Sequence, residues 1–140
     1  MDNAAGILGL AKKAGKLEIG EESVSTAVRQ NRARLIMSAN DASASSREHA
    51  ENLAASGGTV MIVLPYGKEE LGALLGRGSP GIIALTDLGM ALSLTDKLAA
   101  AHPQEYDGAA AALKKKKTRR DERKAAAGSA SGNPAKRRTK

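Results

Sequence analysis

Apolar side chains recur along the first hundred residues in two patterns that alternate. In one pattern they stand three and four positions apart, as on one face of a helix; Ile7, Leu10, Ala11 and Ala14 are an example. In the other, three to five apolar residues follow one another without a break, which indicates a strand that is covered on both faces of a sheet. The alternation of helical and strand patterns predicts an α/β protein.

The two patterns place nine elements within residues 1–101. We expect helices from Asp2 or Asn3 to Gly15, over residues 21–31, from Ser45 to Gly57, from Lys68 to Gly76 and after Asp87, and strands over residues 17–19, 35–37, 60–64 and 82–85. Ser45 and Glu48 have the spacing of a capping box, and Asp87 is suited to cap the last helix. Strands that alternate with helices in this way predict a three-layer α/β/α sandwich.

Beyond Pro103 the apolar pattern stops. Leu113 is the only large aliphatic side chain after Leu98. Such a segment buries too little apolar surface to offset the entropy of ordering it. We therefore predict a disordered tail over residues 102–140, transiently helical around residues 109–126. Two roles stay open for it: a basic arm that raises affinity for RNA without choosing a sequence, or a solubilising tail.

The net charge of +7 comes from that tail. Residues 1–101 carry 10 basic and 11 acidic side chains, whereas residues 102–140 carry 12 basic and 4 acidic ones. Within the predicted domain, the basic side chains outnumber the acidic ones only in residues 1–40, with 6 against 4. A basic protein suggests a polyanionic partner, either nucleic acid or an anionic membrane.

The chain offers few groups for catalysis or targeting. It has no cysteine, which excludes disulfides and thiolate metal sites, and no apolar run approaches the roughly 18 residues of a membrane span. His49 and His102 have no companions at metal-ligand spacing. Residues 72–79 are glycine-rich, but they lack the Gly-Lys-Ser/Thr of a phosphate loop and follow a helix. We therefore expect a cytoplasmic protein that is not an enzyme and has no metal, cofactor or membrane partner.

One stretch, residues 17–23, combines a short apolar segment, a glycine and an acidic helix start. The first turn of a helix has unpaired N–H groups and partial positive charge, so it can hold a phosphate or face a nucleic-acid groove. Gly20 allows close approach of a partner, and Glu21 and Glu22 can accept hydrogen bonds from base amino groups. The alternative is an ordinary helix start whose carboxylates complement the helix dipole.

Aromatic side chains are nearly absent. The chain has no Phe or Trp, and only Tyr66 and Tyr106. Proteins that read single-stranded RNA usually stack its bases on aromatic rings. An RNA partner of this chain is therefore expected to be a structured fold, contacted through its backbone and a few base edges.

Five segments, in order over about residues 5–98, resemble the kink-turn RNA-binding ribosomal proteins, and in particular their small bacterial homologues. This superfamily is typified by archaeal large-subunit protein seven-A-e and eukaryotic protein thirty-e. The segments are Leu10–Leu17, Gly20–Glu22, Ala39–Ser43, Lys68–Gly72 and Ala84–Gly89. The resemblance implies an α/β/α sandwich with a mixed four-stranded sheet. It also implies binding to kink-turns, which are bent RNA helices with tandem sheared G·A pairs.

The resemblance further implies which residues bind RNA. In the family, the turn after the first strand and the helix start behind it enter the bent groove, while a second loop covers a flipped-out nucleotide. By position, the groove residues are Gly20, Glu21, Glu22 and Ser23, the residues that face phosphates are Lys13 and Lys16, and the covering loop is Ser79, Pro80, Gly81 and Ile82.

The chain departs from the best-studied members at this helix start. Those members have a Gly-Thr-Asn-Glu type of motif, whereas Glu22 and Ser23 stand at its last two positions here. Glu22 can accept a hydrogen bond from a base amine but cannot donate one as Asn can. Gly-Glu-Glu is shared by bacterial members.

These observations predict a monomeric, non-enzymatic protein that binds structured RNA, with ribosomal RNA and the ribosome as the expected partners. Two alternatives stay open. Similar folds form the substrate-binding domain of some RNA methyltransferases, so the chain could be the RNA-binding partner of a modifying enzyme. Related folds also act as protein-interaction modules.

Overall fold

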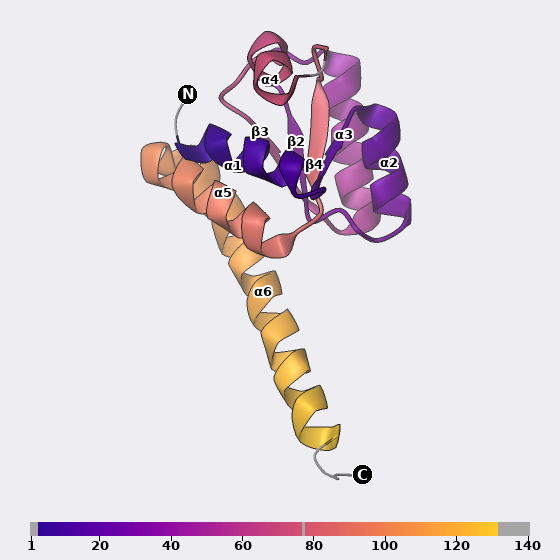
Figure 1. The fold of residues 1–140 in the computed structure, drawn as a ribbon, viewed down its shortest axis with the longest axis vertical. Coiled ribbons are helices and arrows are strands. Elements are labelled where there is room, and N and C mark those ends of the chain that lie inside the picture. The colour runs from indigo at the N-terminus through magenta and orange to yellow at the C-terminus, as the bar shows by residue number, and fades with distance from the viewer. Residues whose placement is uncertain (1–2, 77, 132–140) are drawn as a thin grey trace.

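The structure, a computed structural model, describes residues 3–76 and 78–131, of which residues 127–131 are described by their backbone alone (Figure 1). It contains six helices and four strands within these residues. They are α1 (Asn3–Lys13), β1 (Leu17–Ile19), α2 (Glu21–Arg29), β2 (Leu35–Ser38), α3 (Ala44–Gly57), β3 (Val60–Val63), α4 (Lys68–Leu75), β4 (Ile82–Leu85), α5 (Leu88–Ala101) and α6 (Pro103–Ser131).

The four strands form one mixed sheet in the order β1-β4-β2-β3. β4 pairs antiparallel with both β1 and β2, and β2 pairs parallel with β3. Leu85 lies opposite Leu17 on one side and opposite Leu35 on the other. The mixed four-stranded sheet implied by the resemblance is thereby confirmed.

Helices cover both faces of the sheet, which gives the predicted three layers. Leu35 and Met37 of β2 pack with α1, α4 and α5 on one face, whereas Ile36 packs with α2 and α3 on the other. All four residues of β2 and all four of β4 are buried. Two of the three continuous apolar runs therefore correspond to the central strands β2 and β4, as a sheet covered on both faces requires. The third run, residues 60–64, forms the edge strand β3, in which only Ile62 is buried.

The strand directions give the sheet two distinct ends. At the end that we call the Gly20 end, β1 finishes and β4 begins, and the Gly20 N–H donates to the Ile82 carbonyl at 2.9 Å. At the opposite end, the Lys16 end, β1 begins and β4 finishes, and the Thr86 N–H donates to the Lys16 carbonyl at 2.9 Å. The loops at these two ends carry the candidate functional residues.

Most helix boundaries agree with the sequence prediction, and one cap differs. Gly15 follows α1 with a positive φ of 72°, and the Asp87 carboxylate accepts from the Met90 N–H at 2.8 Å, so Asp87 caps α5 as predicted. The cap of α3 is Ser43, not Ser45: the Ser43 hydroxyl accepts from the Ser46 N–H at 3.1 Å. The helix begins two residues earlier because Ser43 has the extended backbone that a cap requires.

Residues 103–131 form a continuous helix, α6, where the sequence predicted disorder with transient helix. Tyr106 is only 2% exposed and Leu113 is fully buried, and both belong to the core on the α1, α4 and α5 face. The Tyr106 hydroxyl also donates to the Val63 carbonyl of β3 at 2.6 Å. These two side chains lie seven residues apart on one face of the helix, so they attach it to the domain without an extended apolar pattern.

The second half of α6 leaves the domain and projects away from it (Figure 1). It carries the basic segment from Lys114 to Lys124, so the helix is mostly polar there. Residues 132–140 of the predicted tail lie outside the described residues. Among the described helices, none is long and apolar enough to cross a membrane.

The attachment of α6 can be tested by removing the Leu113 side chain. We expect Leu113→Ala to lower the free energy of unfolding by about 2–5 kcal/mol, because it removes a fully buried side chain from the core. Leu10→Ala is the matched control, since Leu10 is 60% exposed, and should change it by less than about 0.5 kcal/mol. Equal effects in denaturant titrations would show that α6 does not pack on the domain.

The burial of Tyr106 predicts a loss of stability at high pH. Burial, together with the nearby Glu105 carboxylate, raises the pKa of Tyr106 from 10.0 to about 12. Between these values the unfolded chain releases the phenol proton while the folded protein keeps it, so the free energy of unfolding falls as pH rises, by up to about 3 kcal/mol. Tyr106→Phe should lack this part of the decline when unfolding is followed from pH 9 to pH 12; an unchanged decline would contradict the assignment.

Candidate nucleic-acid interface

Gly20 joins β1 to α2 in a backbone conformation that other residues avoid. Its φ is 98° and its ψ is 157°, a region populated almost only by glycine. A Cβ built at this position would meet no atom within 4 Å, so the space beside the backbone is open. The constraint at Gly20 is therefore conformational, and the open space leaves room for a partner to approach the turn.

The start of α2 has no side-chain cap, because its cap position is this glycine. The first hydrogen bond within the helix runs from the Val24 N–H to the Gly20 carbonyl at 3.0 Å. The N–H groups of the first turn point out of the helix start and carry its partial positive charge. The geometry matches that of helix starts that accept anionic or hydrogen-bond-accepting partners.

Gly81 and Ile82, the last two residues of the segment 79–82, lie directly beside this helix start. The Gly20 N–H donates to Ile82, and the Ala39 N–H donates to the Gly81 carbonyl at 2.9 Å, so residues 81 and 82 are held between two loops. A Cβ on Gly81 would lie 3.9 Å from the Lys68 side chain. The structure thus brings the Gly81–Ile82 end of the second segment to residue 20, the start of the first, whereas the sequence placed the two segments in one site only through the resemblance.

Glu21 is engaged by helix α3. Its carboxylate lies 2.8 Å from Nδ1 of His49 and accepts from the Ser46 hydroxyl at 3.1 Å. The hydrogen bond with His49, and then the one with Ser46, lowers the pKa of Glu21. In the sequence, His49 has no companion at metal-ligand spacing, and nothing there links His49 to Glu21, because the two positions are 28 residues apart. Glu21 orients the helix start against α3, which leaves Glu22 as the less constrained acceptor.

Glu22 is exposed and faces a shallow hollow on the outer side of α2. Ser23, Thr26 and Arg32 also line this hollow. Arg32 donates to the Glu18 carboxylate at 3.2 Å and to the Gln30 side chain at 2.7 Å, so it is held along the edge of the sheet. Arg32 is a cation beside Glu22 that sequence reasoning did not select.

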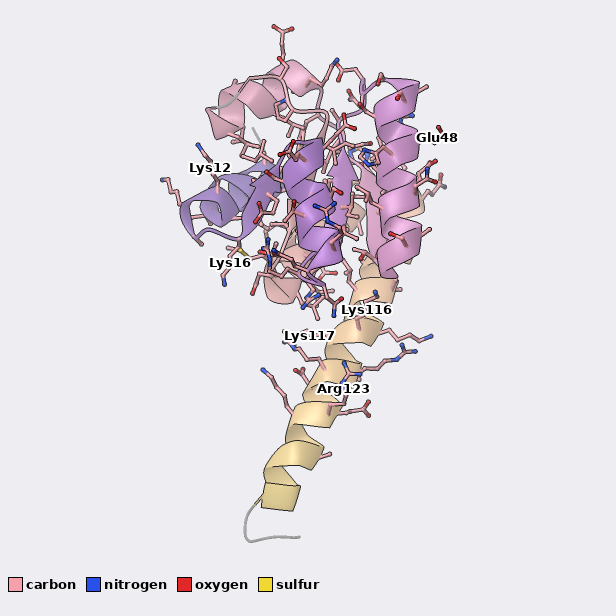
Figure 2. The ribbon with its side chains drawn as sticks, turned by 90° about the vertical axis from the view of Figure 1, so that its right-hand side faces the viewer. Lys12, Lys16, Glu48, Lys116, Lys117 and Arg123 are labelled. Atoms are coloured by element: carbon pink, nitrogen blue, oxygen red, sulfur yellow. The ribbon has the colours of Figure 1, made fainter. Side chains whose placement is uncertain are left out.

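Lys13 and Lys16 are not brought to Gly20. Both lie before β1, at the Lys16 end of the sheet, and the three residues of β1 separate them from Gly20. At about 3.3 Å per residue, the backbone of residue 16 lies about 13 Å from that of residue 20. Figure 2 shows Lys16 on the lower side of the domain, the side from which α6 emerges.

Two other cations stand near the Gly20 end instead. The Lys68 side chain lies beside Gly81, and its backbone N–H donates to the Asp41 carboxylate at 2.8 Å. Arg47 donates through Nη2 to the Asn40 carbonyl at 3.0 Å, whereas its buried Nε has no hydrogen-bond partner among the described residues. These residues come from α4 and α3, so only the sheet topology brings them to the site.

A metal centre is not part of this site as the structure describes it. Within residues 3–76 and 78–126, no three His, Asp or Glu side chains are placed to hold a metal ion together. Glu21 and Asp41 are paired with protein donors, whereas Glu22 has no such contact within the described residues. What the site presents to a partner is a helix start, one free carboxylate, two flanking cations and the backbone of residues 79–82.

Comparison with known proteins identifies the fold and the family. A solved structure from Bacillus halodurans C, of a protein with unknown function, is 25% identical to the chain, with a TM-score of 0.63. The similarity covers 69% of this chain and 96% of that one. No curated protein matches the chain significantly.

The family model that matches is the one described as the ribosomal protein L7Ae/L30e/S12e/Gadd45 family, and the match spans residues 2–90. It includes β1 to β4, the helix start at Gly20 and the segment of residues 79–82, and it ends within α5. Helix α6 lies beyond it. The chain therefore belongs to the ribosomal protein L7Ae/L30e/S12e/Gadd45 family.

Proposed function

We propose that this protein is a non-catalytic RNA-binding protein and that its Gly20 end recognises a kink-turn or a similar bent motif, in ribosomal RNA or another structured RNA. The observation that carries the proposal is the hydrogen bond between the Gly20 N–H and the Ile82 carbonyl. It joins the two segments to which the family resemblance assigns RNA contacts into one surface. We further propose that the protein acts as a monomer in the cytoplasm, with the ribosome as its site of action.

The chemistry of the Gly20 end suits a groove lined by base edges. The uncapped helix start supplies donors, and Glu22 supplies an acceptor for the exocyclic amines of bases. Because Gly20 has no side chain and open space beside it, an RNA backbone can approach closely there. Lys68 and Arg47 are placed to face phosphates on either side.

The positions of the tyrosines support a structured RNA rather than a single strand. Tyr66 is 6% exposed and Tyr106 is 2% exposed, and the chain has no other aromatic side chain apart from its two histidines. Neither ring presents a face on which an unpaired base could stack. Recognition therefore depends on shape, backbone contacts and a few hydrogen bonds to base edges.

The main test is a binding titration of the full chain against a kink-turn duplex. The control RNA is the same duplex with its sheared G·A pairs replaced by Watson–Crick pairs. We expect a preference for the kink-turn that persists at higher salt, because contacts to base edges are less sensitive to salt than contacts to phosphates. Gly20→Ala should weaken kink-turn binding at least tenfold, since alanine at this φ and ψ costs about 1–3 kcal/mol and shifts the helix start.

Gly15→Ala is the matched control for that variant. Gly15 also has a positive φ and open space around it, but it lies on the other side of β1. Its substitution should reduce stability without changing the preference between the two duplexes. Equal binding of both duplexes by the unaltered chain would count against kink-turn recognition, and recovery of one stoichiometric protein without RNA would favour a protein-interaction module.

Separate substitutions of Glu22 and Lys16 distinguish specificity from general attraction. Glu22→Ala removes an acceptor at the Gly20 end, so it should reduce the preference for the kink-turn over the control duplex about tenfold, a loss on the scale of one base contact. Lys16→Ala removes a cation at the opposite end, so it should weaken binding to both duplexes by the same small factor. If Lys16→Ala reduces the preference for the kink-turn and Glu22→Ala weakens binding to both duplexes equally, the specific site does not lie at Gly20.

A further inference from the structure

A second surface with a distinct character lies at the Lys16 end of the sheet, where α6 leaves the domain. A pocket of about 360 Å³ is enclosed there between α6 and the loops before β2 and β3. Gly58 and Thr59 form part of one wall, Asn31 and Arg34 form another, and α6 closes the third side. A volume of this size is enough for a phosphate group with its bound water.

The lining of this pocket is strongly basic. Five of the eleven residues that line it are basic and none is acidic. The basic residues are Arg34, Lys116, Arg119, Arg120 and Arg123. The four from α6 are spaced at i, i+3, i+4 and i+7, so they lie on one face of the helix, the face toward the domain. We call this set the α6 basic face.

Three of these five basic side chains, Arg34, Lys116 and Arg120, have partners among the described residues, and two do not. Lys116 donates to the Gly58 carbonyl at the end of α3, where a cation suits the helix dipole. Arg34 donates to the Asn31 carbonyl at 3.1 Å. The guanidinium groups of Arg119 and Arg123 make no hydrogen bond or ion pair with any other described residue. The buried Nε of Arg120 has no hydrogen-bond partner among the described residues.

Among the described residues, one carboxylate of α6 forms an ion pair with this face, and it does so at Arg120. Asp121 accepts from Lys117 at 2.9 Å and lies 3.5 Å from Nη2 of Arg120, and neither Asp121 nor Lys117 lines the pocket. Like charges at helical spacings of three and four destabilise a helix unless an anion lies between them. The α6 basic face is therefore an arrangement that a bound anion would stabilise.

We propose that this pocket binds a backbone phosphate of RNA, as a second contact at the opposite end of the domain from Gly20. Guanidinium groups match the oxygens of a phosphate through paired hydrogen bonds, and Arg34, Arg119 and Arg123 converge on the pocket. A polymer is favoured over a free ion because α6 carries further cations beside the pocket, Lys117 and Lys124, the first of which Figure 2 shows. This inference rests on the proposed function for the class of ligand.

The test compares two double variants of the full chain with equal loss of charge. Arg119→Gln with Arg123→Gln removes two exposed arginines of the pocket, whereas Lys114→Gln with Lys115→Gln removes two exposed lysines of the same helix that do not line it. All four positions are exposed, so both variants should fold. We expect the arginine pair to weaken RNA binding about tenfold more than the lysine pair, and to reduce the slope of log affinity against log salt by about 1–2.

The two RNA duplexes separate this inference from the proposed function. The arginine pair should weaken binding to the kink-turn and to its control by the same factor, because a phosphate contact carries no sequence information. Equal losses of RNA affinity in the arginine and lysine pairs would contradict phosphate binding in the pocket, even if the protein still prefers the kink-turn. If Gly20→Ala removes the preference for the kink-turn, and the arginine pair still weakens binding to both duplexes by the same factor, the two proposals are supported separately.

Titration with inorganic phosphate tests whether the ligand of the pocket is a phosphate of RNA or that of a small molecule. Thermal unfolding of the full chain is followed with inorganic phosphate and with pyrophosphate, and each is also added to the RNA titration as a competitor. Stabilisation that is lost in the arginine pair, together with weaker RNA binding by that pair, supports the proposal. Stabilisation by phosphate with no change in RNA affinity would assign the pocket to a small phosphorylated ligand and overturn RNA as its occupant.

Discussion

The antiparallel pairing of β1 with β4 determines where the helix start at Gly20 lies. It ends in the hydrogen bond from Gly20 to Ile82, which places the helix start of α2 beside residues 79–82. Because β1 has only three residues, the same pairing also sets the distance between the Gly20 end and the Lys16 end. The glycine-only backbone at Gly20 makes the connection from β1 to α2 possible, so the position of the helix start depends on one residue type.

The two ends of the sheet differ in their chemistry, and a different kind of RNA contact is proposed for each. At the Gly20 end, donors, acceptors and a few cations are combined, as recognition of base edges requires. At the Lys16 end, arginines from α6 and from the start of β2 gather without a carboxylate in the pocket. A structured RNA in contact with both ends would be recognised at one and held electrostatically at the other, which compensates for the acidic Glu22 at the recognition end.

The local pattern of the sequence predicted the nine elements of the sandwich, because apolar spacing and glycine turns are properties of short segments. In place of α6 it predicted only a transient helix around residues 109–126, because Tyr106 and Leu113 are isolated apolar residues whose burial depends on surfaces of β3 and α5 that form far away in the chain. The candidate site likewise has a part that the sequence predicted and a part that it did not. Gly20 and its helix start could be predicted from residues 17–23 and the resemblance, whereas the His49 contact with Glu21 and the separation of Lys16 from Gly20 follow only from the topology.

The contact between Tyr106 and Val63 has a consequence for solubility. In the order β1-β4-β2-β3, the outermost strands are β1 and β3, and an exposed edge strand can pair with a second molecule and begin aggregation. The phenol of Tyr106 donates to the carbonyl of Val63, and Gly108, Ala109 and Ala112 of α6 line a hollow beside β3. The other edge, β1, is short and carries the charged Glu18. A second molecule that added a strand to β3 would therefore meet α6 and its hydrogen bond to Val63 first, whether or not RNA is bound.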